Sequence, residues 1–90
     1  MNKAQIIDLV ARKSKLPKRA VSDVVEIFLN QVIDVLSKGD KVTLSGFGTF
    51  KIQKIQSKTV RLPNSDTYVK IQPHRVVRFK SGKALERAVW

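Results

Sequence analysis

The spacing of apolar residues changes near residue 41 of this 90-residue chain. Before that point apolar residues recur every three or four positions, as they do on one face of a helix. After it they alternate with polar residues, so that Val42, Leu44, Phe50 and Ile52 share one side. A chain that changes period in this way combines both kinds of secondary structure. The sequence therefore predicts an α+β fold, with helices first and a small antiparallel sheet second.

The N-terminal part of the chain carries the signals of two helices. Asn2 and Gln5 form a capping-box pattern at the start of the first helix. Pro17 suits the first turn of a second helix, because the N–H group that proline lacks would be unpaired there. That helix is expected to run to about Lys38, where Gly39 can take the left-handed conformation that ends a helix.

The second predicted helix has an apolar face wider than one short helix and a small sheet would cover. At about 100° per residue, its apolar side chains span roughly half the circumference. We expect this face to pack partly on a second copy of the chain, and the alternative is a core helix buried within a monomer. The face consists of Val21, Val24, Val25, Phe28, Leu29, Val32, Ile33, Val35 and Leu36, and Asp23, Glu26, Asn30 and Asp34 lie opposite.

The C-terminal half of the chain contains turn and excursion signals. Gly46-Phe47-Gly48 predicts a tight turn that directs Phe47 into the core and leaves backbone N–H groups exposed. Residues 54–67 have few large apolar side chains and are expected to leave the body as a long β-ribbon or a flexible loop. Ser81 is expected to cap a last short helix. One domain is predicted. Its helical dimerisation part is residues 1–40, its sheet and arm are residues 41–80, with the arm at about 53–75, and its C-terminal helix is residues 81–90.

Positive charge is concentrated in the second half of the chain. Lys and Arg number 18 against 7 Asp and Glu, which gives a formal net charge of +11. Residues 1–40 carry a net charge of +2, and residues 41–83 carry +9. Such segregation predicts a polyanionic partner, either nucleic acid or an anionic membrane surface. The alternative is a basic protein whose charge serves only its solubility.

Catalysis and metal binding find no support in the sequence. There is no cysteine, and the single histidine, His74, has no neighbouring nucleophile or cluster of metal ligands. No apolar run approaches the roughly 18 residues of a membrane span, and no secretory signal is present. We therefore expect a cytoplasmic protein that is not an enzyme and has no cofactor, metal or small-molecule substrate.

The cations of the second half follow the predicted arm and its base. Each contact with a phosphate releases condensed counterions, so many modest contacts add up to useful affinity. Free N–H groups around Ser81, Gly82 and Lys83 form one expected phosphate site, and those near Gly46 and Gly48 another. Pro63 is either a turn residue or a rigid apolar wedge that enters between base pairs. The side chains predicted to follow the arm are Lys51, Gln53, Lys54, Lys58, Arg61, Lys70, Arg75, Arg78, Lys80 and Lys83.

Several motifs resemble those of the bacterial HU and integration host factor family over essentially the whole chain. They are Met1-Asn2-Lys3, Lys38-Gly39-Asp40-Lys41-Val42, Gly46-Phe47-Gly48-Thr49-Phe50, Arg61-Leu62-Pro63 and Phe79-Lys80-Ser81-Gly82-Lys83-Ala84-Leu85. The resemblance implies an intertwined dimer with a helical base and two extended β-ribbon arms that follow the minor groove of a duplex. It also implies that Pro63 intercalates and that Arg61 enters the groove. By the same resemblance Gln53, Lys58 and Lys70 line the arm, and Lys3, Lys80, Ser81, Gly82 and Lys83 hold phosphates.

The arm tip departs from the family pattern. The family usually has glycine-arginine-asparagine-proline followed by a threonine-glycine turn, whereas this chain has Val60-Arg61-Leu62-Pro63-Asn64-Ser65-Asp66. Asn64 and Asp66 replace the turn glycines with residues that tolerate left-handed conformations. Ile55 stands where the family commonly has a basic residue.

The sequence predicts a nucleoid-associated architectural protein that binds double-stranded DNA mainly without sequence specificity, bends it and helps to compact the chromosome. The partner chain is expected to be a second copy, with a paralogue as the alternative. A site-selective DNA-bending factor resembling integration host factor is the nearest competing function. An RNA-binding protein and a protein of anionic membrane surfaces are further alternatives.

Overall fold

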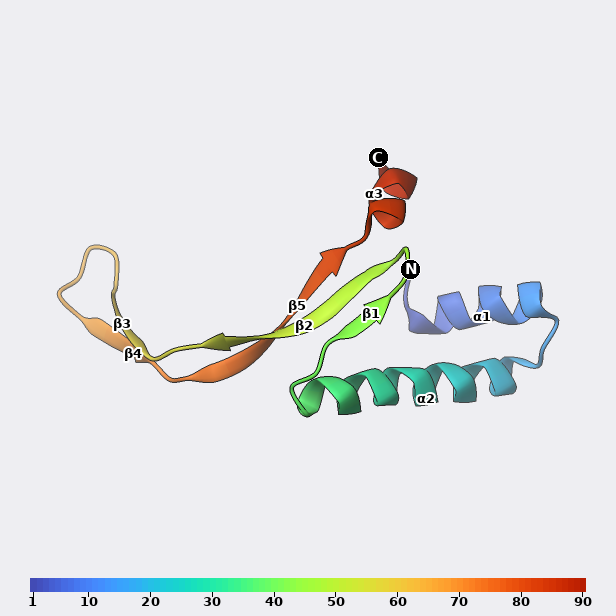
Figure 1. Ribbon diagram of the computed structural model, residues 1–90, viewed down its shortest axis with the longest axis horizontal. Coiled ribbons are helices and arrows are strands. Elements are labelled where there is room, and N and C mark those ends of the chain that lie inside the picture. Colours follow the sequence, from blue (N-terminus) through green and yellow to red (C-terminus); the bar gives the residue numbers. More distant parts are fainter. The chain divides into compact units, whose positions relative to one another are not determined.

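The computed structural model describes residues 1 to 90 (Figure 1). The chain forms three helices and five strands, and none of the helices is both long and apolar enough to cross a lipid bilayer. The predicted α+β fold is confirmed. Contacts divide the chain into two compact units, Met1–Val35 and Leu36–Trp90. The elements are α1 (Lys3–Ser14), α2 (Lys18–Ser37), β1 (Val42–Leu44), β2 (Gly48–Ile55), β3 (Lys58–Arg61), β4 (Tyr68–Ile71), β5 (His74–Ser81) and α3 (Lys83–Val89).

The first unit begins with the predicted capping box. The Asn2 side chain accepts a hydrogen bond of 3.0 Å from the Gln5 backbone N–H, and the Gln5 side chain accepts one of 2.9 Å from the Asn2 N–H. Both bonds satisfy N–H groups that have no partner within a helix. Helix α1 ends at Lys15, which adopts a left-handed conformation with φ of 59°. The predicted start of α1 is therefore confirmed.

The core of the first unit is small. Ile7 and Ala11 of α1 pack against Val21 of α2, and the half-buried Val25 adjoins them. These residues recur at helical spacing, so each helix turns one narrow apolar stripe toward the other. The two helices form an antiparallel pair joined by a short turn (Figure 1).

Part of the apolar face of α2 is exposed in the single chain. Val24, Ile27 and Ile33 are 65%, 62% and 63% exposed, and Phe28 is 48% exposed. Four of the nine residues of the predicted face, Val24, Phe28, Leu29 and Ile33, are thus exposed in the single chain, and the other five are buried or half-buried. Packing of this face on a second copy stays a prediction. Ile27 is also exposed, but it lies outside the predicted apolar arc. The helix ends near Gly39, as predicted, with φ of 89°.

Three antiparallel strands form the body of the second unit, in the order β1-β2-β5. Alternation places Phe50 on the side that packs against Phe79, with ring centroids 4.7 Å apart. Gly48 is buried in this sheet, and a side chain there would lie 2.6 Å from the Lys80 carbonyl oxygen. A residue larger than glycine would separate β2 from β5, so the sheet requires glycine at this point.

The predicted turn at residues 46 to 48 is present, but Phe47 does not enter the core. Gly46 has a φ of 79°, a conformation that glycine adopts without strain. Phe47 is 47% exposed, and the centroid of its ring lies 5.7 Å from that of the Phe79 ring. Its N–H group donates to the Leu44 carbonyl oxygen at 2.9 Å, so this group is not free, contrary to the prediction. The prediction that Phe47 enters the core was wrong, because the backbone hydrogen bond of the turn holds this residue at the apex, where its side chain stays half exposed.

The excursion after β2 is a β-ribbon. Strands β3 and β4 pair from Lys58↔Ile71 to Arg61↔Tyr68, and β2 pairs with β5 as far as Ile55↔His74. Two unpaired residues separate the ladders on each strand, 56 to 57 and 72 to 73, so the register continues across the break without a bulge. Pro73 lies in the break and lacks the N–H group that a ladder uses. The alternative of a flexible loop is therefore wrong.

The last helix begins one residue later than predicted. Gly82 is the N-cap residue of α3, and no side chain accepts a capping hydrogen bond there. Ser81 instead ends β5, and its hydroxyl group bonds to the Glu86 carboxylate. Its predicted capping role was wrong because the strand pairing Gly48↔Ser81 holds this residue in the sheet.

Candidate nucleic-acid interface

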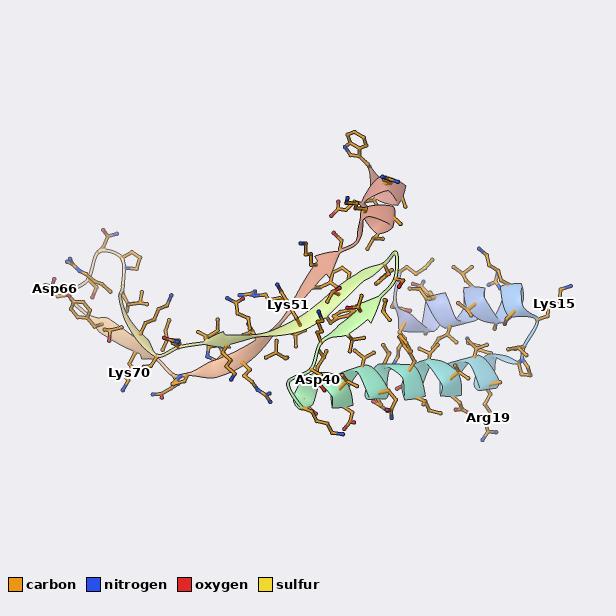
Figure 2. The ribbon with its side chains drawn as sticks, in the orientation of Figure 1. Lys15, Arg19, Asp40, Lys51, Asp66 and Lys70 are labelled. Atoms are coloured by element: carbon orange, nitrogen blue, oxygen red, sulfur yellow. The ribbon has the colours of Figure 1, made fainter.

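The two ladders, β2 paired with β5 and β3 paired with β4, follow one another in a continuous structure that is here called the ribbon. Between Gly48 and Ser81 there are eight Lys and Arg side chains and one acidic side chain, Asp66. All eight cations are exposed. Lys51 and Lys70 lie along the ribbon, and Asp66 lies at its tip (Figure 2). The ribbon therefore presents an almost uniform positive charge to the solvent.

The register separates the predicted side chains onto two faces, because directly paired residues point to the same side of a ladder. One face, here called the cationic face, contains the pairs Lys51↔Arg78, Thr49↔Lys80 and Thr59↔Lys70. Its tip is formed by Arg61↔Tyr68. The predicted residues on this face are Lys51, Gln53, Arg61, Lys70, Arg78 and Lys80.

A hydrogen bond orders the middle of the cationic face. Arg78 Nε donates to Gln53 Oε1 at 2.8 Å, diagonally across β2 and β5. The bond occupies one edge of the guanidinium group and leaves its terminal nitrogen atoms able to donate to phosphate oxygens. Gln53 therefore positions Arg78 in addition to any contact of its own.

The opposite face carries the other predicted arm cations. Lys54 pairs with Arg75, and Lys58 pairs with Ile71. Arg75 also donates to the Ser37 carbonyl oxygen at 3.1 Å, next to the end of α2. Because that carbonyl lies among the last of the helix, the guanidinium group also lies favourably in the field of the helix dipole. Arg75 is thus partly engaged in the protein itself.

The ribbon tip is a closed turn around Pro63. The Leu62 N–H donates to the Thr67 carbonyl oxygen at 3.0 Å, and the Ser65 N–H donates to the Leu62 carbonyl oxygen at 3.3 Å. Asn64 adopts a left-handed conformation with φ of 58°, which agrees with its predicted tolerance. These bonds hold Pro63 and Leu62 at the exposed end of the ribbon.

The base of the ribbon contains the residues predicted to hold phosphates. Lys80 lies on the cationic face, and Lys83 begins α3. The Gly82 N–H donates to the Phe47 carbonyl oxygen at 2.8 Å, so its inclusion among the free N–H groups was wrong. Ser81 is bonded to Glu86. Lys80 and Lys83 are the exposed cations of this region.

Lys3 lies in the first unit, at the start of α1. Its ammonium group forms an ion pair with the Glu26 carboxylate of α2. The two side chains are 54% and 47% exposed, so the pair is a solvated surface interaction. An exposed ion pair of this kind contributes little free energy, so it does not rule out the predicted phosphate contact of Lys3.

Several polar residues on the cationic face were not among the predicted site residues, and they include Thr49, Thr59, Tyr68 and His74. His74 Nδ1 lies 2.8 Å from the Gln72 carbonyl oxygen, which assigns the proton to Nδ1. Tyr68 is 63% exposed beside Arg61. The signal that would have found them is the pairing register, since alternation alone does not tell which residues of two strands share a side.

Comparison with known proteins shows which family the chain resembles. The family described as "Bacterial DNA-binding protein" matches residues 1–90. DNA-binding protein HU-alpha of Vibrio proteolyticus is 42% identical over 89 residues, which cover 99% of each chain. DNA-binding protein HU of Buchnera aphidicola is 39% identical, over 99% of this chain and 97% of that protein.

The chain belongs to the HU family of bacterial DNA-binding proteins. The predicted resemblance is thus confirmed. The Anabaena HU structure solved as a cocrystal with DNA has a TM-score of 0.88 and 35% identity, covering 99% of this chain and 97% of that one. HU from Thermotoga maritima has a TM-score of 0.73 and 31% identity over the full length of both chains. The relatives are described by name as DNA-binding proteins.

Proposed function

We propose that this HU-family protein is an architectural protein that binds double-stranded DNA through its phosphate backbone and bends it. The observation that carries the proposal is the ribbon, where eight exposed cations accompany one acid between Gly48 and Ser81. A two-stranded ribbon fits a groove of the duplex, and cations along its length meet successive phosphates. The DNA in the Anabaena cocrystal supports the same partner for this chain.

Bending is proposed to come from the ribbon tip in the minor groove. Pro63 stands on a turn closed by two backbone hydrogen bonds, so little conformational freedom remains to be lost on insertion. Architectural minor-groove proteins insert apolar side chains between base steps, and unstacking a step costs a few kcal/mol, offset by contacts with the bent duplex. Arg61 beside the wedge would enter the groove, where the potential is most negative.

The active form is proposed to be a dimer with two such ribbons. The exposed part of the apolar face of α2 includes Val24, Phe28, Leu29 and Ile33, and a second copy of the chain would cover it. A homodimer is favoured because the same face then meets itself, and a paralogue with the same face would also fit. Two ribbons on one duplex would together bend and compact chromosomal DNA in the nucleoid, with little dependence on sequence because the contacts are mostly to phosphates.

The test is a titration of labelled linear duplexes at several salt concentrations. The logarithm of the association constant should fall linearly with the logarithm of the salt concentration. Lys70→Gln on the cationic face should reduce that slope by about 0.9 for each phosphate that the protein no longer neutralises. Lys13→Gln, which removes an exposed lysine far from the ribbon in sequence, serves as the matched control and should keep the slope. Absence of binding to linear duplex in dilute buffer would overturn the proposal.

A further inference from the structure

The side chain of Arg61 folds back over the turn at the ribbon tip. Its Nε donates to the Ser65 carbonyl oxygen at 2.8 Å, and its Nη2 donates to Asp66 Oδ1 at 3.1 Å. The remaining N–H groups of the guanidinium and the second carboxylate oxygen point to no protein partner. Arg61 and Asp66 therefore form one unit that presents hydrogen-bond donors and an acceptor side by side.

The Asp66 side chain forms a hydrogen bond and an ion pair with Arg61 alone. The turn is closed by the backbone bonds of Leu62 and by the Thr67 N–H, which donates to Ser65 Oγ at 3.0 Å. The Asp66 side chain is fully exposed, and it is the one acidic group between Gly48 and Ser81. A carboxylate at the end of a ribbon that binds a polyanion opposes binding, unless a donor on the DNA meets it.

The minor groove offers one such donor. A·T and T·A pairs present only acceptors there, the N3 atom of adenine and the O2 atom of thymine, whereas a G·C pair adds the N2 amino group of guanine. A guanidinium donor beside a carboxylate acceptor matches the edge of G·C, with the arginine on cytosine O2 or guanine N3 and the aspartate on the amino group. Opposite A·T the carboxylate faces acceptors alone.

We propose that Asp66, held in place by Arg61, makes the ribbon tip favour G·C over A·T at the base step beside Pro63. This inference rests on the proposed function, because it requires the tip to lie in the minor groove. It assigns Asp66 as a residue that determines base preference in an otherwise backbone-directed interaction.

The experiment uses the full-length protein and four duplexes that share one alternating pyrimidine–purine pattern. The base pairs are G·C, inosine·C, A·T and 2,6-diaminopurine·T, so the minor-groove amino group is removed from one pair and added to the other. We expect the wild type to bind each amino-bearing duplex about fivefold more tightly than its amino-free counterpart, or more. Asp66→Ala should bring both ratios close to one.

The amino group also changes groove width and stiffness, and a matched variant separates this effect. Asp40→Ala removes an exposed acidic charge in the same unit, away from the tip, and should raise affinity without changing either ratio. Equal ratios in wild type and Asp66→Ala would overturn the inference. So would a variant Asp66→Ala that gains affinity by the same factor on all four duplexes. Equal wild-type affinity for the four duplexes overturns the inference alone, whereas absence of binding to any of them overturns the proposed function as well.

Discussion

At Gly48 strand β2 lies against β5 with no room for a side chain. A Cβ atom there would lie 2.5 Å from Phe79 Cζ and 2.6 Å from the Lys80 carbonyl oxygen. The phenylalanine ring can rotate, but the carbonyl oxygen belongs to the paired strand and moves only with the sheet. Gly48→Ala is therefore expected to cost about 1–3 kcal/mol of folding free energy, as overpacking does. Thermal unfolding by circular dichroism should show a melting temperature lower by roughly 4–8 °C per kcal/mol.

Gly82 provides the comparison for this substitution. Its Cβ would meet the backbone of Gly46 and Phe47 at 3.3 Å, which is tight but not overlapping. Gly82→Ala should lower the melting temperature less than Gly48→Ala at the same protein concentration. If Gly48→Ala melts at the wild-type temperature, the close approach of the two strands at this point is wrong.

At the scale of the element, the ribbon tip should act on the shape of DNA more than on affinity. Pro63→Ala removes the rigid ring but leaves the cations of the ribbon in place, so the phosphate contacts persist. We expect a clearly smaller bend and an affinity within about tenfold of wild type, since unstacking a base step and the contacts it permits nearly offset each other. Energy transfer between dyes at the two ends of a duplex measures the bend.

Pro17→Ala is the control for the ribbon-tip variant. It makes the same chemical change in the turn between α1 and α2, outside the ribbon, and should leave the energy transfer of the complex unchanged. Should Pro63→Ala and the wild type give the same energy transfer, Pro63 is a turn residue and the bend arises elsewhere.

The elements differ in how far the sequence foretold them. Capping signals at Asn2 and the closing glycine at Gly39 act locally, and both were predicted correctly. Whether residues 54 to 67 form a ribbon or a loop depends on pairing with a segment that follows later in the chain, which composition does not reveal. The same pairing decides that Arg61 and Lys70 share a face while Lys58 lies on the other. The contact between Arg61 and Asp66 likewise follows from the turn geometry, and the sequence offered no signal for it.

At the scale of the whole molecule, the single chain buries very little. Only Ile7, Ala11, Val21 and Leu36 are buried apolar residues in a chain of 90. Small domains are marginal even when their cores are complete, so a core this small favours further cover by a second chain. The proposed dimer would remove the apolar face of α2 from water and would link folding to association.

Ile33→Glu tests this link, because Ile33 is 63% exposed on the apolar face of α2. Each dimer would lose the burial of two isoleucine side chains, about 3–6 kcal/mol in all, and would also have to desolvate two carboxylates. We expect the dissociation constant to rise by at least about 100-fold, as measured by sedimentation velocity over a range of concentrations. The melting temperature of the wild type should rise with protein concentration.

Asn30→Glu places the same charge on the polar side of α2 and should leave the protein dimeric. A wild type that sediments as a monomer and melts at a temperature independent of concentration would mean that its apolar face has another partner, such as a paralogue. A dimer that persists in Ile33→Glu would place the contact on a different surface. The proposed homodimer requires that the charge disrupt association at position 33 and not at position 30. Because two ribbons on one duplex depend on that association, Ile33→Glu should also abolish bending at protein concentrations where the wild type bends DNA fully.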